Sequence, residues 1–359
     1  MKIAFIVYQD FNLGAGYVIA YLKSIGHQVR LFLIHSPQSQ RRFPLAAINR
    51  FSPDLVCFSC VTANHGWALR DAKIITTGKV CSDILFGGVH PTLCPEDFKG
   101  YGDVCIGSGE EYFGGKFLPD KLWPDREIFF EQLPPVHRSH QIFMTGFGCP
   151  FRCSFCNNHQ LHEKLIRRDH LTCIDELLYL KHAQKAKYIL FDDDIFTLNR
   201  NWLIDFLHYY GQYINLPFTC FGHAKYIDTD IARLLKGYNC QCVWLGVQSG
   251  DEDTRKHILN RPETNDQIRE ACHIIKEAGM KLMIDHIFGI PQDNYDKLLT
   301  SYNFYKEIKP DVINCYEMLY LPKARINKYG YSKALHQKQG GWDYQRYANS
   351  FSSIPLMVH

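Results

Sequence analysis

The stretch Gly148-Cys149-Pro150-Phe151-Arg152-Cys153-Ser154-Phe155-Cys156 places three cysteines within eight positions. An odd number of thiols cannot all pair with one another as disulfides. Three and then two residues separate the cysteines, so a short loop can direct all three sulfurs at one inorganic centre. Gly148 and Pro150 are typical of a tight loop, which favours such a centre over three unrelated core cysteines.

Two kinds of centre fit this spacing. A structural zinc ion normally takes four protein ligands, and His159 and His162 are the local candidates for the fourth. A 4Fe–4S cluster normally takes four cysteines, so three would leave one iron open to another ligand. An open iron makes a reactive site rather than a structural one, and we regard the cluster as the leading interpretation.

The Cys-x3-Cys-x2-Cys spacing, with Phe155 before the third cysteine, resembles that of the radical S-adenosylmethionine (SAM) enzymes. In that family the three cysteines hold a 4Fe–4S cluster, and the open iron chelates SAM. The resemblance implies that Cys149, Cys153 and Cys156 are the metal ligands. It also implies that Phe155 lies near the adenine of SAM.

Length and composition indicate two globular domains and exclude several classes of protein. The chain has 359 residues, against about 150 per domain, and is 46% hydrophobic. A net charge of +3 without a dense basic run argues against nucleic-acid binding. Residues 2–8 are too short for a secretory signal, and no apolar run is long enough to span a membrane. Fourteen cysteines are then expected to be thiols or metal ligands, and we expect a cytoplasmic protein.

Residues 1–116 alternate between apolar strands and helical segments, which predicts a doubly wound, Rossmann-like α/β sheet. Ligands of such sheets bind beyond the carboxyl ends of the strands. Glycine lets the backbone approach a ligand closely, and glycines follow three of the strands, at positions 14 and 16, 87 and 88, and 107 and 109. This edge is expected to hold a large flat or extended ligand. A nicotinamide dinucleotide is the generic candidate, although G-x-G-x-x-G is incomplete.

The segments "PDLVCFSCVT", "GGVHPTLCPE" and "DVCIGSGEE" resemble the cobalamin-binding domain of one radical SAM subgroup. The resemblance implies eight cobalamin contacts: Leu13, Gly14, Ser59, Thr62, Gly88, His90, Thr92 and Gly109. The first loop reads "YQDFNLGAG" and lacks the Asp-x-His-x-x-Gly sequence of other cobalamin proteins. That loop is therefore expected to supply no histidine to cobalt.

Residues 117–140 are expected to form a linker, and residues 141–322 a second domain. Helical segments alternate there with six apolar strands, which fits the partial (β/α)6 TIM barrel of the radical SAM family. Residues 323–359 are expected to be a C-terminal tail that packs on the barrel or forms a lid over its mouth. Its aromatic residues are Tyr329, Tyr331, Trp342, Tyr344 and Tyr347.

Functional side chains of such barrels lie at the carboxyl ends of the strands. Together with Phe155, the resemblance implies these SAM contacts: Asp192, Asp193, His223, Gln248, Ser249, Gly289 and Pro291. Gln248 replaces the glutamate usual in the family, so it can form hydrogen bonds but carries no charge. Arg255, in the same segment, is predicted to be an ordinary helix residue.

The resemblance implies a cobalamin-dependent radical SAM enzyme that methylates an unreactive carbon through a 5′-deoxyadenosyl radical and methylcobalamin. A cyclase or rearrangement enzyme without methyl transfer, a non-catalytic iron–sulfur or corrinoid protein, and a zinc module remain alternatives. The expected partners are a small-molecule or peptide substrate and a low-potential electron donor such as a flavodoxin or ferredoxin. Neither nucleic acid nor a membrane span is expected, and no individual catalytic residue is predicted.

Overall fold

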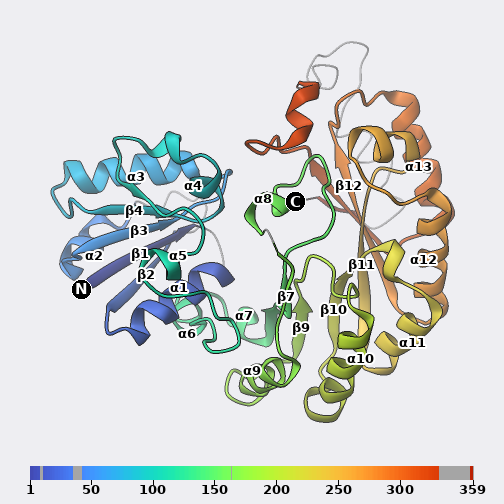
Figure 1. Cartoon of the computed structure of the whole chain (residues 1–359), viewed down its shortest axis with the longest axis horizontal. Coiled ribbons are helices and arrows are strands. Elements are labelled where there is room, and N and C mark those ends of the chain that lie inside the picture. The colour runs from blue at the N-terminus through green and yellow to red at the C-terminus, as the bar shows by residue number, and fades with distance from the viewer. Residues whose placement is uncertain (9–10, 35–42, 163, 331–355, 359) are drawn as a thin grey trace. The chain divides into compact units, whose positions relative to one another are not determined.

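The computed structural model describes residues 1–8, 11–34, 43–162 and 164–330, and the backbone of Leu356–Val358. The chain divides into two compact units, Met1–Arg138 and Ser139–His359. Each unit contains a parallel β-sheet with helices packed against it (Figure 1).

The first unit contains a five-stranded parallel sheet in the order β2-β1-β3-β4-β5. Its strands are β1 (Lys2–Tyr8), β2 (Gln28–Ile34), β3 (Leu55–Ser59), β4 (Ile84–Gly87) and β5 (Asp103–Val104). This is the flavodoxin-like version of the doubly wound fold, which confirms the predicted fold class. The strand order reverses between β1 and β3, and ligands of such sheets bind at that carboxyl-end crevice.

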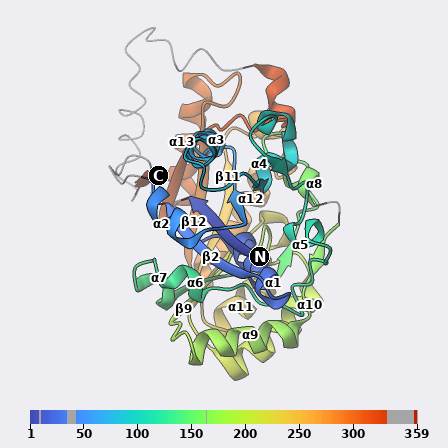
Figure 2. The ribbon, with the colours of Figure 1, turned by 90° about the vertical axis from the view of Figure 1, so that its left-hand side faces the viewer.

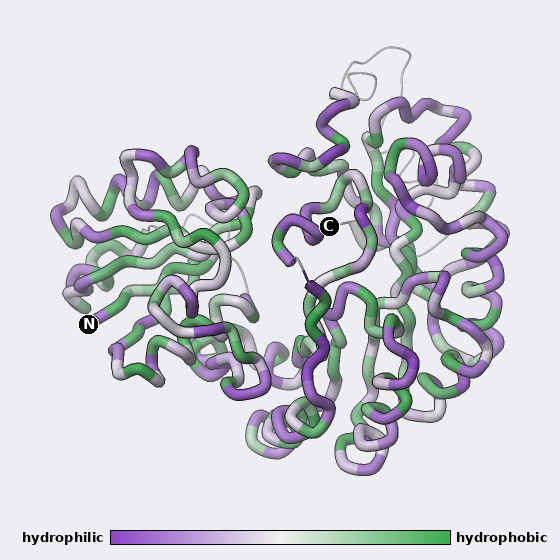
Figure 3. Tube along the Cα trace, viewed as in Figure 1, coloured by the Kyte–Doolittle hydropathy of each residue, from purple (hydrophilic) through white to green (hydrophobic). Residues whose placement is uncertain are grey.

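Both faces of this sheet are covered, as the unbroken apolar sequence of β1 predicts. Side chains of β1 alternate between two buried clusters, one containing Phe5 and Val7 and the other Ile6 and Tyr8. Figure 3 shows the concentration of hydrophobic residues on these strands. The helices of the unit are α1 (Leu13–Ser24), α2 (Leu45–Phe51), α3 (His65–Thr77), α4 (Val89–Leu93), η1 (Pro95–Phe98), α5 (Gly109–Tyr112), α6 (Glu127–Phe130) and α7 (Val136–Ser139).

The segment predicted as a linker, residues 117–140, packs largely on the first unit. Phe129 and Phe130 of α6 are buried in one of its two clusters. The side chain of Gln132 donates to the carbonyl of Leu31 at 3.1 Å and accepts from the amide of Leu33 at 3.1 Å. Gln132 thus satisfies backbone groups on the edge strand β2, and the first unit continues to Arg138.

The second unit contains a seven-stranded sheet in the order β14-β13-β12-β11-β10-β9-β6, with every pair parallel. Its strands are β6 (His140–Phe143), β9 (Tyr188–Phe191), β10 (Phe218–Gly222), β11 (Cys240–Gln248), β12 (Lys281–Phe288), β13 (Val312–Glu317) and β14 (Leu356–Val358). The first six are the strands predicted, and β14 adds a short strand from the tail. Because β6 and β14 each pair on one side only, the described sheet is an open barrel.

Five helices cover the outer face of this sheet, with α9 and α13 at opposite ends of the layer (Figures 1 and 2). They are α9 (His170–His182), α10 (Arg200–Tyr209), which continues into η2 (Tyr210–Ile214), α11 (Thr229–Gly237), α12 (Asn265–Glu277) and α13 (Tyr295–Ile308). Each begins at a side chain that accepts a backbone N–H, which fixes where each loop ends. These N-cap residues are Asp169, Asn199, Asp228, Thr264 and Asn294.

The remaining short elements lie beside the carboxyl ends of the strands. They are β7 (Gly146–Phe147) and β8 (Ile166–Arg167), which pair antiparallel, α8 (Asn158–Leu161), η3 (Ala224–Tyr226), η4 (Thr254–Ile258) and η5 (Arg325–Tyr329). Tyr331, Trp342, Tyr344 and Tyr347 of the predicted lid lie outside the described residues. Among the helices that are described, none combines the length and the apolar character that crossing a membrane requires.

Candidate active site

The three cysteines lie in a loop between β7 and α8 in the second unit. Gly148 opens the loop with φ +90°, a conformation that glycine adopts without strain. A Cβ at this position would lie 3.1 Å from the carbonyl oxygen of Lys164. The tight turn predicted at Gly148 is therefore present, and it starts the loop directly before Cys149.

Hydrogen bonds hold this loop from two sides. The Ser154 amide donates to the carbonyl of Leu259 at 2.8 Å, and the Asn260 side chain donates to the carbonyl of Arg152 at 2.7 Å. On the other side, the amide of Ile326 donates to the carbonyl of Ser154 at 2.8 Å. The segment after β11 and the η5 helix thus fix the loop between its first and last cysteines.

All three thiols are free, with Cys153 buried and the other two half-buried. Burial raises the pKa of Cys149 to about 11, and the nearby carboxylate of Asp194 adds to the increase. Burial also raises the pKa of Cys153 and of Cys156. Without metal the loop therefore holds neutral thiols, which lose their protons when iron or another metal ion binds.

The three cysteine sulfurs are not as close together as one bound zinc ion would hold them. Sulfurs on one tetrahedral zinc ion would lie about 3.8 Å apart, given Zn–S bonds of about 2.3 Å. In the described part of the chain, only the group of His65, His90 and Asp97 brings three ligand atoms within 4.8 Å of one another. The sulfurs of Cys149, Cys153 and Cys156 therefore do not all lie within 4.8 Å of one another, a spacing that a 4Fe–4S cluster can accommodate.

Arg261 connects the cysteine loop to a buried carboxylate. Its Nη1 atom donates to the sulfur of Cys153 at 3.8 Å, and its Nη2 atom donates to the carbonyl of Gly246 at 2.5 Å and to Glu263. Glu263 also lies 3.0 Å from Nε2 of His223. The sequence prediction included His223 but neither Arg261 nor Glu263.

Glu263 is charged in this environment. Burial alone would raise its pKa, but the hydrogen bond from His223 and the charge of Arg261 hold the pKa at about 2. The His223 ring in turn stacks on Phe151 of the cysteine loop, with centroids 4.3 Å apart. His223 thus contacts both the loop and the carboxylate, and the second oxygen of Glu263 is buried with no partner among the described residues.

Gln248 ends β11 in an unusual conformation. Its φ is +70°, and the register between β11 and β12 shifts between Gly246 and Gln248. A Cβ added at Gly246 would lie 2.8 Å from Nε2 of Gln248 and 3.8 Å from the guanidinium of Arg261. Glycine therefore leaves the space that lets the Gln248 amide lie near Arg261, and the backbone strain is of the kind found at functional sites.

Asp285 is a further carboxylate beside this group that the sequence prediction missed. It pairs with Gly246 across β11 and β12. Its Oδ1 atom accepts from the indole of Trp244 at 2.6 Å and from the amide of Asn314 at 3.3 Å. Burial raises its pKa to about 6. An acidic residue alternating with the core-facing residues of an apolar strand was the available sequence signal.

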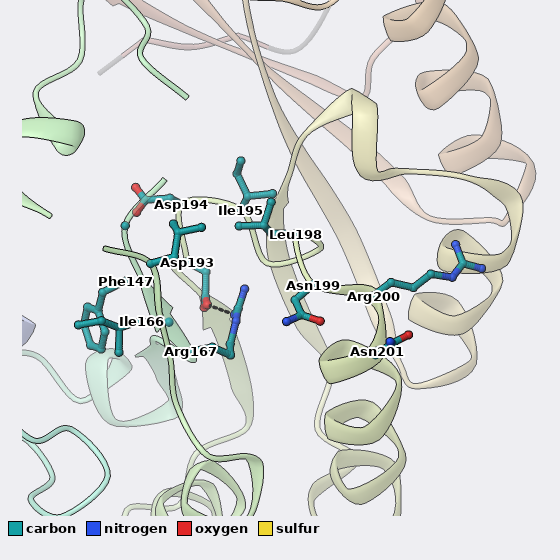
Figure 4. A pocket seen from close by; sticks show the side chains of 13 residues that line it. Phe147, Ile166, Arg167, Asp193, Asp194, Ile195, Leu198, Asn199, Arg200 and Asn201 are labelled. Carbon is teal, nitrogen blue, oxygen red and sulfur yellow. Dashed lines mark hydrogen bonds and ion pairs between the residues drawn. The ribbon is translucent and has the colours of Figure 1, made fainter. Parts of the chain in front are cut away.

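The three aspartates after β9 have different surroundings. Asp193 is buried and accepts from the amide of Thr145 at 3.0 Å and from Arg167 at 2.8 Å (Figure 4). Asp192 and Asp194 are exposed, and surrounding protein atoms together with the other two carboxylates raise the pKa of Asp192 to about 6. The structure uses Asp193 to hold the turn after β6 and leaves its two neighbours accessible.

Three of the other predicted SAM contacts, Phe155, Gly289 and Pro291, lie at an apolar wall, and the fourth, Ser249, has other neighbours. Phe155 packs against a buried cluster that includes Ile290, in the turn between Gly289 and Pro291. Gly289 has φ +75° and Pro291 is buried. Ser249 follows the end of β11. Its hydroxyl accepts from the amide of Asp251 at 3.2 Å and lies 3.4 Å from the hydroxyl of Ser301 on α13. The structure therefore does not bring Ser249 to the group around Arg261.

A cavity of about 430 Å³ lies beside the cysteine loop (Figure 4). Its walls combine apolar residues with the Arg167–Asp193 ion pair and the carboxylate of Asp194. The lining residues are Gly146, Phe147, Gly148, Leu165, Ile166, Arg167, Asp193, Asp194, Ile195, Leu198, Asn199, Arg200 and Asn201. The cavity has the size of a small-molecule site and lies directly next to Cys149 in the chain.

In the first unit, the predicted cobalamin residues gather at the carboxyl edge of the sheet. Gly88 has φ +103°, and a Cβ there would lie 2.7 Å from the carbonyl oxygen of Cys60. The hydroxyl of Thr92 donates to the carbonyl of Gly88 at 2.8 Å and accepts from the amide of Gly107 at 3.1 Å. Leu13 and Gly14 start α1, Ser59 ends β3, Thr62 follows it, and Gly109 starts α5. The glycines and the backbone hydrogen bonds of Thr92 thus leave room for a broad ligand to approach the backbone at this edge.

His90 is buried on this edge, and both of its ring nitrogens have partners. Nδ1 lies 3.2 Å from the hydroxyl of Thr62, and Nε2 lies 3.1 Å from a carboxylate oxygen of Asp97. The ring also stacks on His65, with centroids 4.1 Å apart. Nearly parallel rings do not point their nitrogens at one ion between them, so the group suits a positioning role better than metal binding.

Comparisons with known proteins match each of the two units to a known domain. Residues 5–115 match the B12 binding domain, and residues 143–305 match the radical SAM superfamily. An uncharacterised methyltransferase of Pyrococcus horikoshii is 24% identical over 331 residues, or 80% of this chain and 72% of the relative. An anaerobic magnesium-protoporphyrin IX monomethyl ester cyclase of Rubrivivax gelatinosus is 22% identical, over 54% of this chain and 36% of the relative.

The radical SAM methyltransferase TsrM of Kitasatospora setae, solved with cobalamin and a [4Fe-4S] cluster, has the same fold. Its TM-score is 0.71 at 14% identity, over 90% of this chain and 76% of that protein. The predicted cofactors, a 4Fe–4S cluster, SAM and cobalamin, are those that the two matched domains carry. The chain is a member of the radical SAM superfamily that carries a B12-binding domain ahead of its barrel.

Proposed function

We propose that this protein is a cobalamin-dependent radical SAM methyltransferase that acts on an unreactive carbon. The observation that carries the proposal is the presence, in one chain, of a three-cysteine loop on an open barrel and a glycine-lined carboxyl edge on a flavodoxin-like sheet. When bound, the cluster and SAM supply a 5′-deoxyadenosyl radical, and cobalamin supplies a methyl carrier. The protein contributes the positions and charges around them.

SAM carries an ammonium, a carboxylate and two ribose hydroxyls, and the barrel offers a counterpart for each. Asp192 and Asp194 are exposed carboxylates suited to the ammonium, and Arg261 is a buried cation suited to the carboxylate. Gln248 and Asp285 lie next to Arg261 and retain hydrogen-bonding capacity for hydroxyls. The adenine would lie against Phe155 and the Gly289–Pro291 turn, as the family resemblance implies.

The proposed reaction also has consequences for the substrate, the electron donor and the cellular location. The 430 Å³ cavity fits a small molecule or one peptide side chain as substrate. Reduction of the cluster needs a low-potential donor such as a flavodoxin or ferredoxin, and nucleic acid has no part in the proposal. All fourteen cysteines are free, which supports a reducing, cytoplasmic location.

Methyl transfer is testable without knowing the substrate. The anaerobically reconstituted protein is reduced in the presence of SAM carrying a deuterated methyl group. We expect 5′-deoxyadenosine in solution and a three-deuterium mass increase on the protein-bound cobalamin, because SAM is the methyl source. Mass spectrometry of the extracted corrinoid gives the result, and the Cys153→Ala protein is the control for 5′-deoxyadenosine.

A cyclase or rearrangement enzyme is the second candidate, and the similarity to the Rubrivivax cyclase favours it. Such an enzyme would form 5′-deoxyadenosine without transferring deuterium to cobalamin. A non-catalytic iron–sulfur or corrinoid protein would form neither product. The two readouts therefore separate all three functions.

A further inference from the structure

Three surface segments meet around the outer side of the cysteine loop. They are residues 148–162, 254–261 and 318–330. Besides the hydrogen bonds through Ser154 and Asn260 described above, the hydroxyl of Tyr329 donates to the carbonyl of His257 at 3.0 Å. The Gln160 side chain donates to the carbonyl of Lys323 at 3.1 Å. The three segments thus form one continuous surface of the barrel unit.

Within these three segments the exposed formal charges are all positive, and the nearest exposed acidic residues in the described chain, Asp253 and Glu317, lie directly before two of them. None of the three segments contains an aspartate or glutamate. They expose five cations, which we call the basic face: Arg152, Lys256, Lys323, Arg325 and Lys328. These five charges exceed the net charge of the whole chain, +3. Positive charge is therefore more concentrated on the basic face than on the protein surface as a whole.

The cations of the basic face are not neutralised within the described part of the protein. None of them forms an ion pair there, although Lys328 lies over the ring of Tyr329 at 4.6 Å. Burial lowers the pKa of His159, and the charges of Arg325 and then Arg152 add to the decrease. Five unpaired cations around one loop create a positive potential that attracts an acidic partner.

The basic face is also directly connected to the cluster ligands. Arg152 precedes Cys153 in the chain, and η5, which carries Arg325 and Lys328, is hydrogen-bonded to the residue after Cys153. A partner on this surface would therefore contact residues that adjoin the cluster ligands in the chain or through a hydrogen bond.

We propose that the basic face is the docking surface for an acidic flavodoxin-type electron donor, which rests on the proposed radical SAM function. One electron passes from the reduced flavin of the donor to the cluster, so the donor is oxidised by one electron and the cluster is reduced by one. No bond forms between the proteins. Electron-transfer complexes of this kind are small and transient, and complementary charge sets their association rate.

The test is the rate of cluster reduction, followed by the loss of iron–sulfur absorbance in a stopped-flow instrument. Reconstituted protein without SAM or substrate is mixed with a fully reduced acidic flavodoxin at low and high ionic strength. The charge-reversal variant carries Lys323→Glu, Arg325→Glu and Lys328→Glu. We expect its second-order rate constant at low salt to be at least about tenfold lower than that of the unaltered protein, with the difference shrinking as salt is added.

A matched variant makes the same change in total charge elsewhere on the barrel. Arg233, Lys187 and Lys281 are exposed cations on α11 and near the amino ends of β9 and β12, the opposite edge from the cysteine loop. With all three changed to glutamate, we expect a rate within about twofold of the unaltered protein. Photoreduced 5-deazariboflavin, a neutral reductant, should reduce the cluster equally fast in all three proteins.

Three outcomes would overturn the proposal. The first is an unchanged rate in the charge-reversal variant, and the second is an equal loss in the matched variant. The third is binding of a short RNA duplex that depends on the basic face while flavodoxin still reduces the cluster normally, which would assign the surface to a nucleic acid. Absence of a cluster after reconstitution would instead contradict the proposed function and the docking site together, so the two failures are distinguishable.

Discussion

The two sheets of this protein end in edges of opposite character. The carboxyl edge of the first is lined by glycine, threonine and backbone groups, with Gly88 and Thr92 at its centre. The carboxyl edge of the second carries Arg261, Glu263 and Asp285, all partly or fully buried. Both edges are where parallel sheets bind ligands, so the difference lies in the ligand and not in the fold.

The difference shows how one architecture serves two cofactors. A large macrocycle is held over a wide area, and small residues let the backbone approach it. SAM is small and zwitterionic, so its position depends on a few charged groups of opposite sign. A substitution at one edge should therefore impair the binding of one cofactor and leave the binding of the other unchanged. The predictions below test this independence.

The largest effect is expected at the cysteine loop. Cys153→Ala removes one of three ligands, so iron should fall from about four per chain to near zero and 5′-deoxyadenosine formation should be lost. Cobalamin binding should be unchanged, because its residues lie in the other unit. Iron, sulfide and corrin content of the anaerobic protein give the result. Cys81→Ala, at a half-buried thiol of the first unit, is the control, and a variant that kept its iron would contradict the cluster assignment.

The corresponding substitution at the edge of the first unit is Gly88→Ala. The added Cβ would lie 2.7 Å from the carbonyl oxygen of Cys60, in a backbone conformation of φ +103°. The loop after β4 must then shift, so cobalamin affinity should fall at least about tenfold while iron content stays constant. Equilibrium titration with hydroxocobalamin measures the affinity. Gly66→Ala is the matched control, since no atom lies within 4 Å of its added Cβ, and equal losses in both variants would argue against a cradle at Gly88.

The smallest effect is expected on the stability of the protein, when the half-buried carboxylate of Asp285 is neutralised. Burial raises the pKa of Asp285 to about 6, above the value near 4 of an unfolded chain. A raised folded-state pKa gives stability that is complete below pH 4 and is lost as pH rises through 6. Asp285→Asn should therefore stabilise the SAM-free protein by about 3 kcal/mol at pH 8, and less at pH 5.

Thermal midpoints at the two pH values measure this gain, with the exposed Asp205→Asn on α10 as the control. The same variant should bind SAM more weakly, because a neutral amide is a poorer acceptor for hydroxyls than a carboxylate. If Asp285→Asn changed the thermal midpoint by the same amount at both pH values, the raised pKa of Asp285 would be contradicted. Unchanged SAM affinity would remove Asp285 from the proposed site.

Much of the fold could be predicted from the sequence, because local sequence patterns indicate the strands and helices. The alternation of apolar strands and helical segments predicted both parallel sheets, and the six barrel strands were predicted correctly. The boundary between the units was harder to predict. Residues 127–133 look like a linker in composition, and only the docking of Phe129 and Phe130 on the first sheet assigns them to its core.

The sequence did not reveal how neighbouring residues of the candidate site differ in their surroundings. Asp192 and Asp193 are adjacent, yet one is exposed and the other forms an ion pair with Arg167, a distinction that composition does not reveal. Ser249 and Gln248 are likewise neighbours, yet the amide of Gln248 lies near Arg261 and the hydroxyl of Ser249 lies 3.4 Å from that of Ser301. Arg255 and Arg261 are both buried, but Arg255 donates to the carbonyl of Ser249 whereas Arg261 donates to the sulfur of Cys153.

The sequence by itself determined the cysteine loop, because three sulfurs within eight positions are constrained to one turn whatever the rest of the chain does. Only the tertiary structure decided what surrounds those sulfurs. Arg261 contacts Cys153 across 108 residues, and Asp285 reaches the same group only through the register of β11 against β12. Such contacts depend on how strands pair and which face each side chain takes, and a one-residue shift would reverse them.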